Sequence, residues 1–109
     1  MKILKEKVII ENFRETPNSD KKDFYTSDLI KIALNQAQYG SYKDAVKADD
    51  LLDGRFIVKE INDENIILLE NDDYDFVKRT LQAFKPFFQR IYAELFKIID
   101  SAENYNLEK

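Results

Sequence analysis

Residues 69–76 read LENDDYDF and place four carboxylates within eight positions. Closely spaced carboxylate oxygens are the ligands that Ca²⁺ and Mg²⁺ prefer, but an EF-hand loop also needs a central glycine, and none lies here. Carboxylates equally suit the start of a helix, where they satisfy free backbone N–H groups and face the positive end of the helix dipole. We therefore expect Asn71, Asp72 or Asp73 to cap a helix, and we expect no metal and no other cofactor.

Other catalytic groups are scarce along the chain. It contains no histidine and no cysteine, which removes the commonest general base and excludes Ser-His-Asp and Cys-His nucleophilic systems. Its two glycines, Gly40 and Gly54, stand too far apart for a glycine-rich phosphate loop. We expect a protein that is not an enzyme.

Charge is distributed unevenly. The chain carries a net charge of −4, but residues 44–75 contain eleven acidic and three basic residues. Such a surface could imitate a nucleic-acid backbone and occupy the basic channel of an enzyme. An ordinary solvated helix face would have the same composition. The acidic mimic is therefore an alternative to a protein-binding role.

Basic residues alternate with aromatic ones in the last third of the chain. The residues concerned are Lys78, Lys85, Phe87, Phe88, Arg90, Tyr92 and Lys97. This alternation can bind single-stranded nucleic acid. However, Arg90, Glu94 and Lys97 fall on one helix face and would neutralise each other, and the calculated pI is only 4.9. Nucleic acid is not the expected partner, and a weak binder is kept as an alternative.

The same region is richer in aromatic residues than one helix pair needs. Phe76 and Phe96 each lie off the main apolar stripe of their helix, so we expect both to lie outside the core of the monomer. Aromatic and arginine side chains are favoured anchors at protein interfaces. We therefore predict a partner-binding surface made of Phe76, Phe87, Arg90, Phe96 and Lys97.

The amino-terminal quarter reads as an extended arm and loop over residues 1–25. Residues 3–10 are rich in β-branched residues and favour a strand, whereas Pro17, Asn18 and Ser19 indicate a loop over 14–25. A helix should begin near Thr26 or Ser27, whose hydroxyl can cap it, and end before Gly40.

The middle of the chain allows two interpretations. A second helix should start at Ser41 with Asp44 three residues later, close to a capping box. We favour a helix that continues to about Ile61. The alternative ends it at Asp53, with RFIVKEI and IILLE forming a hairpin around NDEN. In both cases residues 65–70 are extended and can pair with the amino-terminal strand.

Two further helices complete the predicted fold. One runs from the carboxylate cluster to about Phe84 and ends before Pro86. The other covers about 87–101, followed by a polar tail over 102–109. We predict a single domain, 1–109, of mainly α (α+β) class, with about four helices packed in a small bundle and a short two-stranded β element.

The location of the protein follows from its apolar runs. The longest, VII and IILL, are far shorter than the ~20 residues that cross a bilayer. The amino-terminal segment alternates charged and apolar residues, unlike a signal peptide. We expect a cytoplasmic protein that has no contact with a membrane.

Four segments follow one another in the order TSDLIKIAL, SYKDAVKADDLLD, IILLENDDYDFVKRTLQAFKP and a final amphipathic helix. In this order the chain resembles small uncharacterised proteins of tailed phages and prophages, over about residues 26–101. Their recurrent segment, L-E/D-x-x-D/E-Y-x-x-L/V-K, corresponds here to Leu69, Glu70, Asp73, Tyr74, Val77 and Lys78. Gly54 and FKPFFQRIY depart from the pattern. The resemblance implies a viral or prophage origin, and hence the host cytoplasm, but no activity and no catalytic residues.

Together these patterns predict a non-enzymatic protein-interaction module. Its partner would be a host protein, a viral protein or a second copy of the chain in a homo-oligomer.

Overall fold

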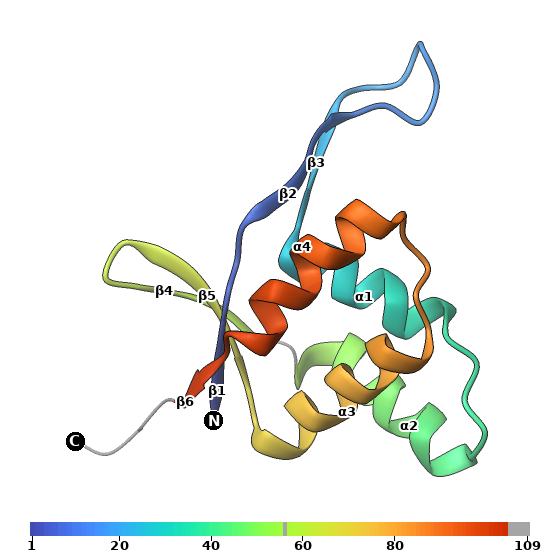
Figure 1. Cartoon of the computed structure of the whole chain (residues 1–109), viewed down its shortest axis with the longest axis vertical. Coiled ribbons are helices and arrows are strands. Elements are labelled where there is room, and N and C mark those ends of the chain that lie inside the picture. The colour runs from blue at the N-terminus through green and yellow to red at the C-terminus, as the bar shows by residue number, and fades with distance from the viewer. Residues whose placement is uncertain (56, 105–109) are drawn as a thin grey trace.

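The computed structural model of the chain describes residues 1–55 and 57–104 (Figure 1). Within these residues the helices are α1 (Thr26–Gln36), α2 (Tyr42–Asp50), α3 (Asn71–Ala83) and α4 (Gln89–Asp100). The strands are β1 (Lys2–Lys5), β2 (Val8–Phe13), β3 (Lys22–Tyr25), β4 (Ile57–Ile61), β5 (Glu64–Leu69) and β6 (Glu103–Asn104). They form a four-stranded sheet, β4-β5-β1-β6, and a two-stranded sheet, β2-β3. The fold is therefore α+β, and the predicted mainly α bundle with a two-stranded β element is wrong.

The four-stranded sheet brings the two ends of the described chain together. β1 lies between β5 and β6 and is antiparallel to both, with Lys2 opposite Leu69 and also opposite Asn104. The predicted pairing of the amino-terminal strand with residues 65–70 is thus confirmed. Residues 66–69 are all buried, so both faces of β5 are covered there. Residues 103 and 104 of the predicted polar tail pair with β1, and residues 105–109 lie outside the described chain.

The hairpin β4–β5 decides between the two interpretations of the middle segment. Helix α2 ends at Asp50, a π-helical turn covers Leu51–Arg55, and β4 follows. Asn62 and Asp63 both have positive φ, 53° and 65°, as a two-residue type I′ hairpin turn requires. The favoured helix to Ile61 is therefore wrong and the alternative hairpin is confirmed. Its β-branched strand residues suit a pleated surface better than a helix.

A second hairpin, β2–β3, projects beyond the helices and forms the upper end of the molecule in Figure 1. Its register is irregular, with shifts between the paired positions 8, 10 and 13 of β2. The rings of Phe13 and Phe24 meet edge to face, with 5.5 Å between centroids. Part of the predicted loop over 14–25 is therefore strand β3, which leads directly into α1.

Helix α1 is fixed at its start by the β1–β2 connection. It begins at Thr26, as predicted, but neither Thr26 nor Ser27 caps it through its own hydroxyl. Instead, the Glu6 carboxylate accepts hydrogen bonds from the Ser27 backbone N–H, at 2.7 Å, and from the Ser27 hydroxyl. The Thr26 hydroxyl accepts from the Lys7 N–H at 3.1 Å. The cap therefore comes from residues about twenty positions earlier in the chain.

The core packs α1, α3 and α4 against the sheet. Its fully buried members include Leu4, Ile30, Ile67, Val77, Leu95 and Ile99. Two tyrosine hydroxyls join the helices: Tyr74 of α3 donates to the Ile99 carbonyl, and Tyr92 of α4 donates to the Leu81 carbonyl, each at 2.7 Å. Pro86 lies in the connection between α3 and α4, as predicted. None of the helices in the described chain is long and apolar enough to cross a membrane.

Candidate functional site

The carboxylate cluster of residues 70–75 lies at the start of α3. Asp72 and Asp73 occupy the first turn, whereas the N-cap residue is Glu70, whose side chain makes no capping hydrogen bond. The predicted cap by Asn71, Asp72 or Asp73 is therefore wrong. Within residues 1–55 and 57–104, no group of three or more acidic, histidine or cysteine side chains could hold a metal ion. The acids here complement the helix dipole.

Asp73 connects this helix to α2. Its side chain is almost fully buried, and its Oδ1 lies 3.8 Å from Nζ of Lys47. The same ammonium group lies over the ring of Phe76, 5.7 Å from the centroid. A buried carboxylate needs a partner to offset its lost hydration. Asp73 is therefore a structural residue of the α2–α3 contact.

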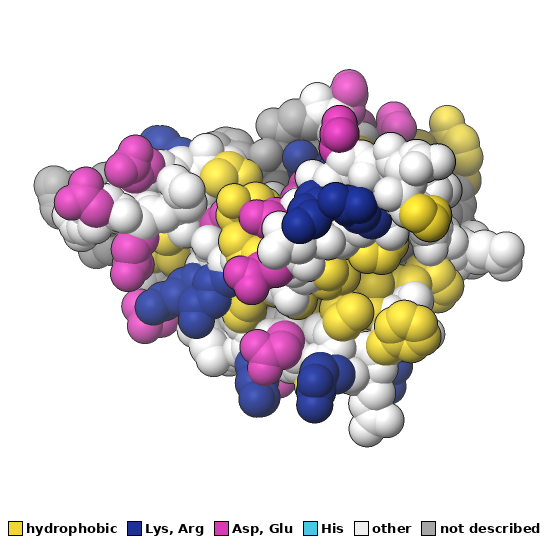
Figure 2. All heavy atoms as spheres, turned by 90° about the horizontal axis from the view of Figure 1, so that it is seen from above, with side chains coloured by type: hydrophobic (Ala, Val, Ile, Leu, Met, Phe, Trp, Pro, Cys, Tyr) yellow, Lys and Arg dark blue, Asp and Glu magenta, His cyan; other side chains and the backbone are white. Residues whose placement is uncertain are grey.

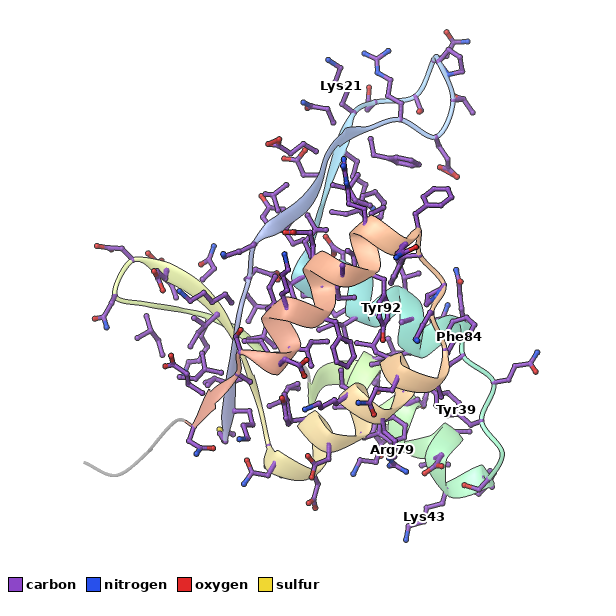
Figure 3. The ribbon with its side chains drawn as sticks, viewed as in Figure 1. Lys21, Tyr39, Lys43, Arg79, Phe84 and Tyr92 are labelled. Atoms are coloured by element: carbon purple, nitrogen blue, oxygen red, sulfur yellow. The ribbon has the colours of Figure 1, made fainter. Side chains whose placement is uncertain are left out.

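Phe76 does not lie outside the core, so this part of the predicted partner surface is wrong. Only 2% of the residue is exposed, and its ring stacks on that of Tyr39 at 5.7 Å between centroids. Tyr39 comes from the α1–α2 connection, which covers the side of α3 that the helix periodicity leaves unpartnered. Arg79 also lies over the Phe76 ring (Figure 3).

The other predicted partner-binding residues belong to α4 or to the segment before it. Phe87 and Phe96 are half-buried against the core, and Phe96 stacks on Tyr92 with 5.4 Å between centroids. Arg90 and Lys97 are exposed. The structure brings these four residues onto one helix and its approach, but not onto one continuous apolar patch.

The predicted basic strip is broken by local partners. Lys78 Nζ lies 3.2 Å from Oδ1 of Asp100, and this hydrogen bond raises the lysine pKa. Lys97 Nζ lies 3.7 Å from Oε1 of Glu94, as their helical spacing predicts. Lys85 lies over the Tyr92 ring. Such neutralised cations attract a phosphate backbone weakly.

A different set of apolar side chains faces solvent. We define the arm surface as Val8, Phe13 and Tyr25 of the β2–β3 hairpin together with Phe88, the residue before α4. Helix α4, which begins one residue after Phe88, contacts β2 of this hairpin. Phe88 is 83% exposed, far more than the 43% of Phe13. Figure 2 shows hydrophobic side chains over the middle and right of this face, and acidic ones over the left, where the β4–β5 hairpin lies.

Phe88 was not predicted as a surface residue, because its spacing fits the apolar stripe of α4. The structure places Phe88 at the N-cap of α4, one residue before the first helical residue, Gln89. The predicted helix start at about residue 87, directly after Pro86, is two residues too early and placed Phe88 inside the helix. Tyr42 on α2 is 86% exposed. It was not predicted as a surface residue, because Ala45 and Ala48 were taken to form the apolar stripe of that helix.

A cavity of about 420 Å³ lies between β1 and α4. Its lining residues are Ile3, Lys5, Lys7, Glu94, Lys97, Ile98, Ser101 and Glu103. An apolar floor and side chains of both signs could hold a small polar ligand. Lys97 and Glu94 face each other as an ion pair, which opposes the use of either as a catalytic base.

A smaller cavity of about 190 Å³ lies between α3 and the α1–α2 connection (Figure 3). Tyr39, Asp44, Arg79 and Thr80 are among its lining residues. Burial raises the pKa of the Tyr39 hydroxyl; a hydrogen bond with Thr80 partly offsets the rise, and Asp44 adds to it. The hydroxyl donates to the Leu34 carbonyl at 2.9 Å. Tyr39 therefore fixes the end of α1, and its hydroxyl group, whose pKa is raised, does not serve as a nucleophile.

Comparisons with protein-family models, with curated protein sequences and with solved structures gave no match for this chain. The chemistry of its own surfaces therefore decides which function is proposed.

Proposed function

We propose that the chain is a non-enzymatic protein-interaction module that binds its partner through the arm surface. One observation carries this proposal: Phe88, the residue before α4, is 83% exposed, and α4 contacts the projecting hairpin (Figure 1), which exposes Phe13. A phenylalanine ring in water retains apolar area that a partner could bury, and aromatic side chains commonly anchor protein interfaces.

The form of the hairpin supports the same proposal. A two-stranded sheet without a covering layer is marginally stable in water, and both of its edges offer backbone groups for pairing. The distal part of β2–β3, over residues 11–23, has little of the body behind it: apart from the half-buried Ser19, its residues are exposed. Docking onto a partner would cover the exposed ring of Phe13 and pair the free strand edges.

The origin in a tailed phage or prophage remains part of the proposal. Its support is the resemblance of residues 26–101, including Asp73 and Tyr74 of the recurrent segment. Both residues are buried and hold α3 to its neighbours. A fold-determining role would explain why a segment of this form recurs among such proteins.

Capture experiments with matched variants test the binding proposal. Immobilised wild-type chain should retain a defined protein from a bacterial lysate, and Phe88→Ser and Phe13→Ser should lose it because each removes an exposed apolar anchor. Val58→Thr is the matched control, since Val58 is 44% exposed on the distant hairpin β4–β5. Circular dichroism would verify the fold of each variant. A wild type that retains nothing and also stays monomeric, or equal retention by Phe88→Ser, would overturn the proposal.

An acidic nucleic-acid mimic is the second candidate. The observation that favours it is the acidic end of the β4–β5 hairpin, where Glu60, Asp63 and Glu64 are all exposed. A mimic should inhibit a nucleic-acid enzyme while binding no nucleic acid itself, and added salt should relieve the inhibition. Gel-shift and inhibition assays with Glu60→Lys against wild type would separate this role from the first.

A further inference from the structure

Helix α2 presents an apolar face that no other described part of the chain covers. Tyr42 is 86% and Val46 39% exposed, and they lie four residues apart on one side of the helix. Asp49, also exposed, continues the same side, and Asp53 follows in the π-helical turn. We call Tyr42, Val46 and Asp49 the α2 face. The helix itself buries only Ala48.

The charge at the carboxyl end of this face is negative. Lys47 could have neutralised it, but its ammonium group is directed to Asp73 at 3.8 Å. The exposed carboxylates of Asp49 and Asp53 therefore face solvent together with the negative end of the helix dipole. The α2 face is apolar at one end and acidic at the other.

The start of α4 has the opposite chemistry. Phe88 is exposed, Arg90 is exposed in the first turn, and no acidic residue lies in that turn. The N-cap makes no side-chain hydrogen bond to the free backbone N–H groups. We call Phe88, Arg90 and these N–H groups the α4 end. It is apolar and positive, and it lacks the acidic residues that usually complement a helix start.

These two surfaces cannot meet within one molecule. Helices α1 and α3 lie between α2 and the first turn of α4 (Figure 1). Lys43 of α2 points away from the body (Figure 3), so the helix faces outward on the far side. Two different complementary patches on one chain describe a heterologous contact, which joins copies head to tail.

We propose that a second copy of this chain is the occupant of the α4 end, docking there through its α2 face. This deepens the proposed function, on which it rests, by naming the partner for the Phe88 part of the arm surface. In the contact, Tyr42 and Val46 of one copy pack on Phe88 of the next, and Asp49 faces Arg90 and the free N–H groups. Because the two patches differ, each copy in a pair still has one unused patch. Further copies can therefore add until a ring closes or an open chain forms.

Sedimentation velocity and light scattering over a concentration series test the proposal. The mass of the wild type should rise with concentration. Phe88→Ser and Tyr42→Ser should each require at least about tenfold higher concentration to assemble, because each removes an anchor of the contact. Val58→Thr should behave as wild type, since Val58 lies on neither patch.

Mixing the two serine variants separates a heterologous contact from any symmetric one. The Phe88→Ser chain keeps an intact α2 face and the Tyr42→Ser chain keeps an intact α4 end, so one good contact can form between them. An equimolar mixture should therefore give a particle of two chains and nothing larger. Charge reversal adds a second measurement: Arg90→Glu and Asp49→Arg should each weaken assembly, and the double variant should regain it.

Three results would overturn the proposal. The first is a wild type that stays monomeric up to about 1 mM, well above the midpoints of specific protein contacts. The others are a mixture that forms no two-chain particle, and a double charge-reversal variant that assembles no better than the two single variants. Failure here is distinguishable from failure of the proposed function. A monomeric wild type that still captures a lysate protein through Phe88 refutes only the self-association.

Discussion

The carboxylate of Glu6 holds the first turn of α1 by accepting hydrogen bonds from both the backbone N–H and the hydroxyl of Ser27. The two residues are 21 positions apart, and Glu6 lies between the strands β1 and β2. The connection between β1 and β2 and the start of α1 therefore form one structural unit.

Glu6→Ala should lower the free energy of unfolding by about 1–2 kcal/mol, since it leaves a helix N–H and a hydroxyl without their acceptor. Glu11→Ala, at an exposed position on β2, is the control and should change little. Urea denaturation followed by circular dichroism measures both. Equal midpoints for the two variants would show that the Glu6 contact contributes no stability.

Tyr74→Phe should cost about 1–2 kcal/mol, because the buried Ile99 carbonyl loses the hydroxyl that donates to it at 2.7 Å. Tyr42→Phe removes the same atom from a side chain that is 86% exposed and should be neutral. Thermal denaturation of the pair gives the comparison. A neutral Tyr74→Phe would mean that water or a backbone shift satisfies the carbonyl.

Phe76→Ala and Phe88→Ala should differ strongly although both delete a phenyl ring. Phe76 is 2% exposed and should cost about 3–5 kcal/mol on truncation, whereas Phe88, at 83% exposed, should cost about 0.5 kcal/mol or less. Denaturant titration of the isolated variants measures the two values. Similar losses would place both rings in the same environment, contrary to the structure.

Stability should decline at alkaline pH. Burial raises the pKa of Tyr39 and Tyr92 above the ordinary value of 10.0, and for Tyr92 the Asp100 charge adds to the rise. Below pH 10 both hydroxyls stay protonated whether the chain is folded or unfolded. As pH rises from 10 through the folded-state pKa, the unfolded chain binds fewer protons, so the free energy of unfolding falls.

Urea unfolding from about pH 8 to 11 measures this slope, which Tyr92→Phe should make shallower because it removes one of the two titrating hydroxyls. Tyr92→Phe also loses the hydrogen bond to the Leu81 carbonyl, so its stability should be lower at every pH. An alkaline slope as steep as that of the wild type would contradict the assignment to Tyr92.

Local signals in the sequence located where the helices begin to within about two residues. Ser41 accepts a hydrogen bond from the Asp44 N–H at 3.2 Å, as the predicted capping pattern requires. The amphipathic period of α4 and the break at Pro86 also correspond to the structure. These features depend on neighbours in the chain, so they can be recognised without knowledge of the fold.

The errors arose where distant segments decide. Residues 57–61 form a segment short enough to suit a helix or a strand, and only its pairing with β5 fixes the outcome. Phe76 lies off the helix stripe, yet Tyr39 from another segment covers it. Helix periodicity tells which residues share a face, but it does not tell how many faces are covered.

The central place of β1 in its sheet has a consequence for synthesis. Its partners β5 and β6 come about 60 and about 100 residues later in the chain, so β1 is synthesised well before the strands with which its ladder groups pair. Until Glu103 has emerged, the nascent chain keeps an apolar strand available to chaperones or to neighbouring nascent chains. Completion of the sheet therefore has to wait until residues 103 and 104 have been synthesised.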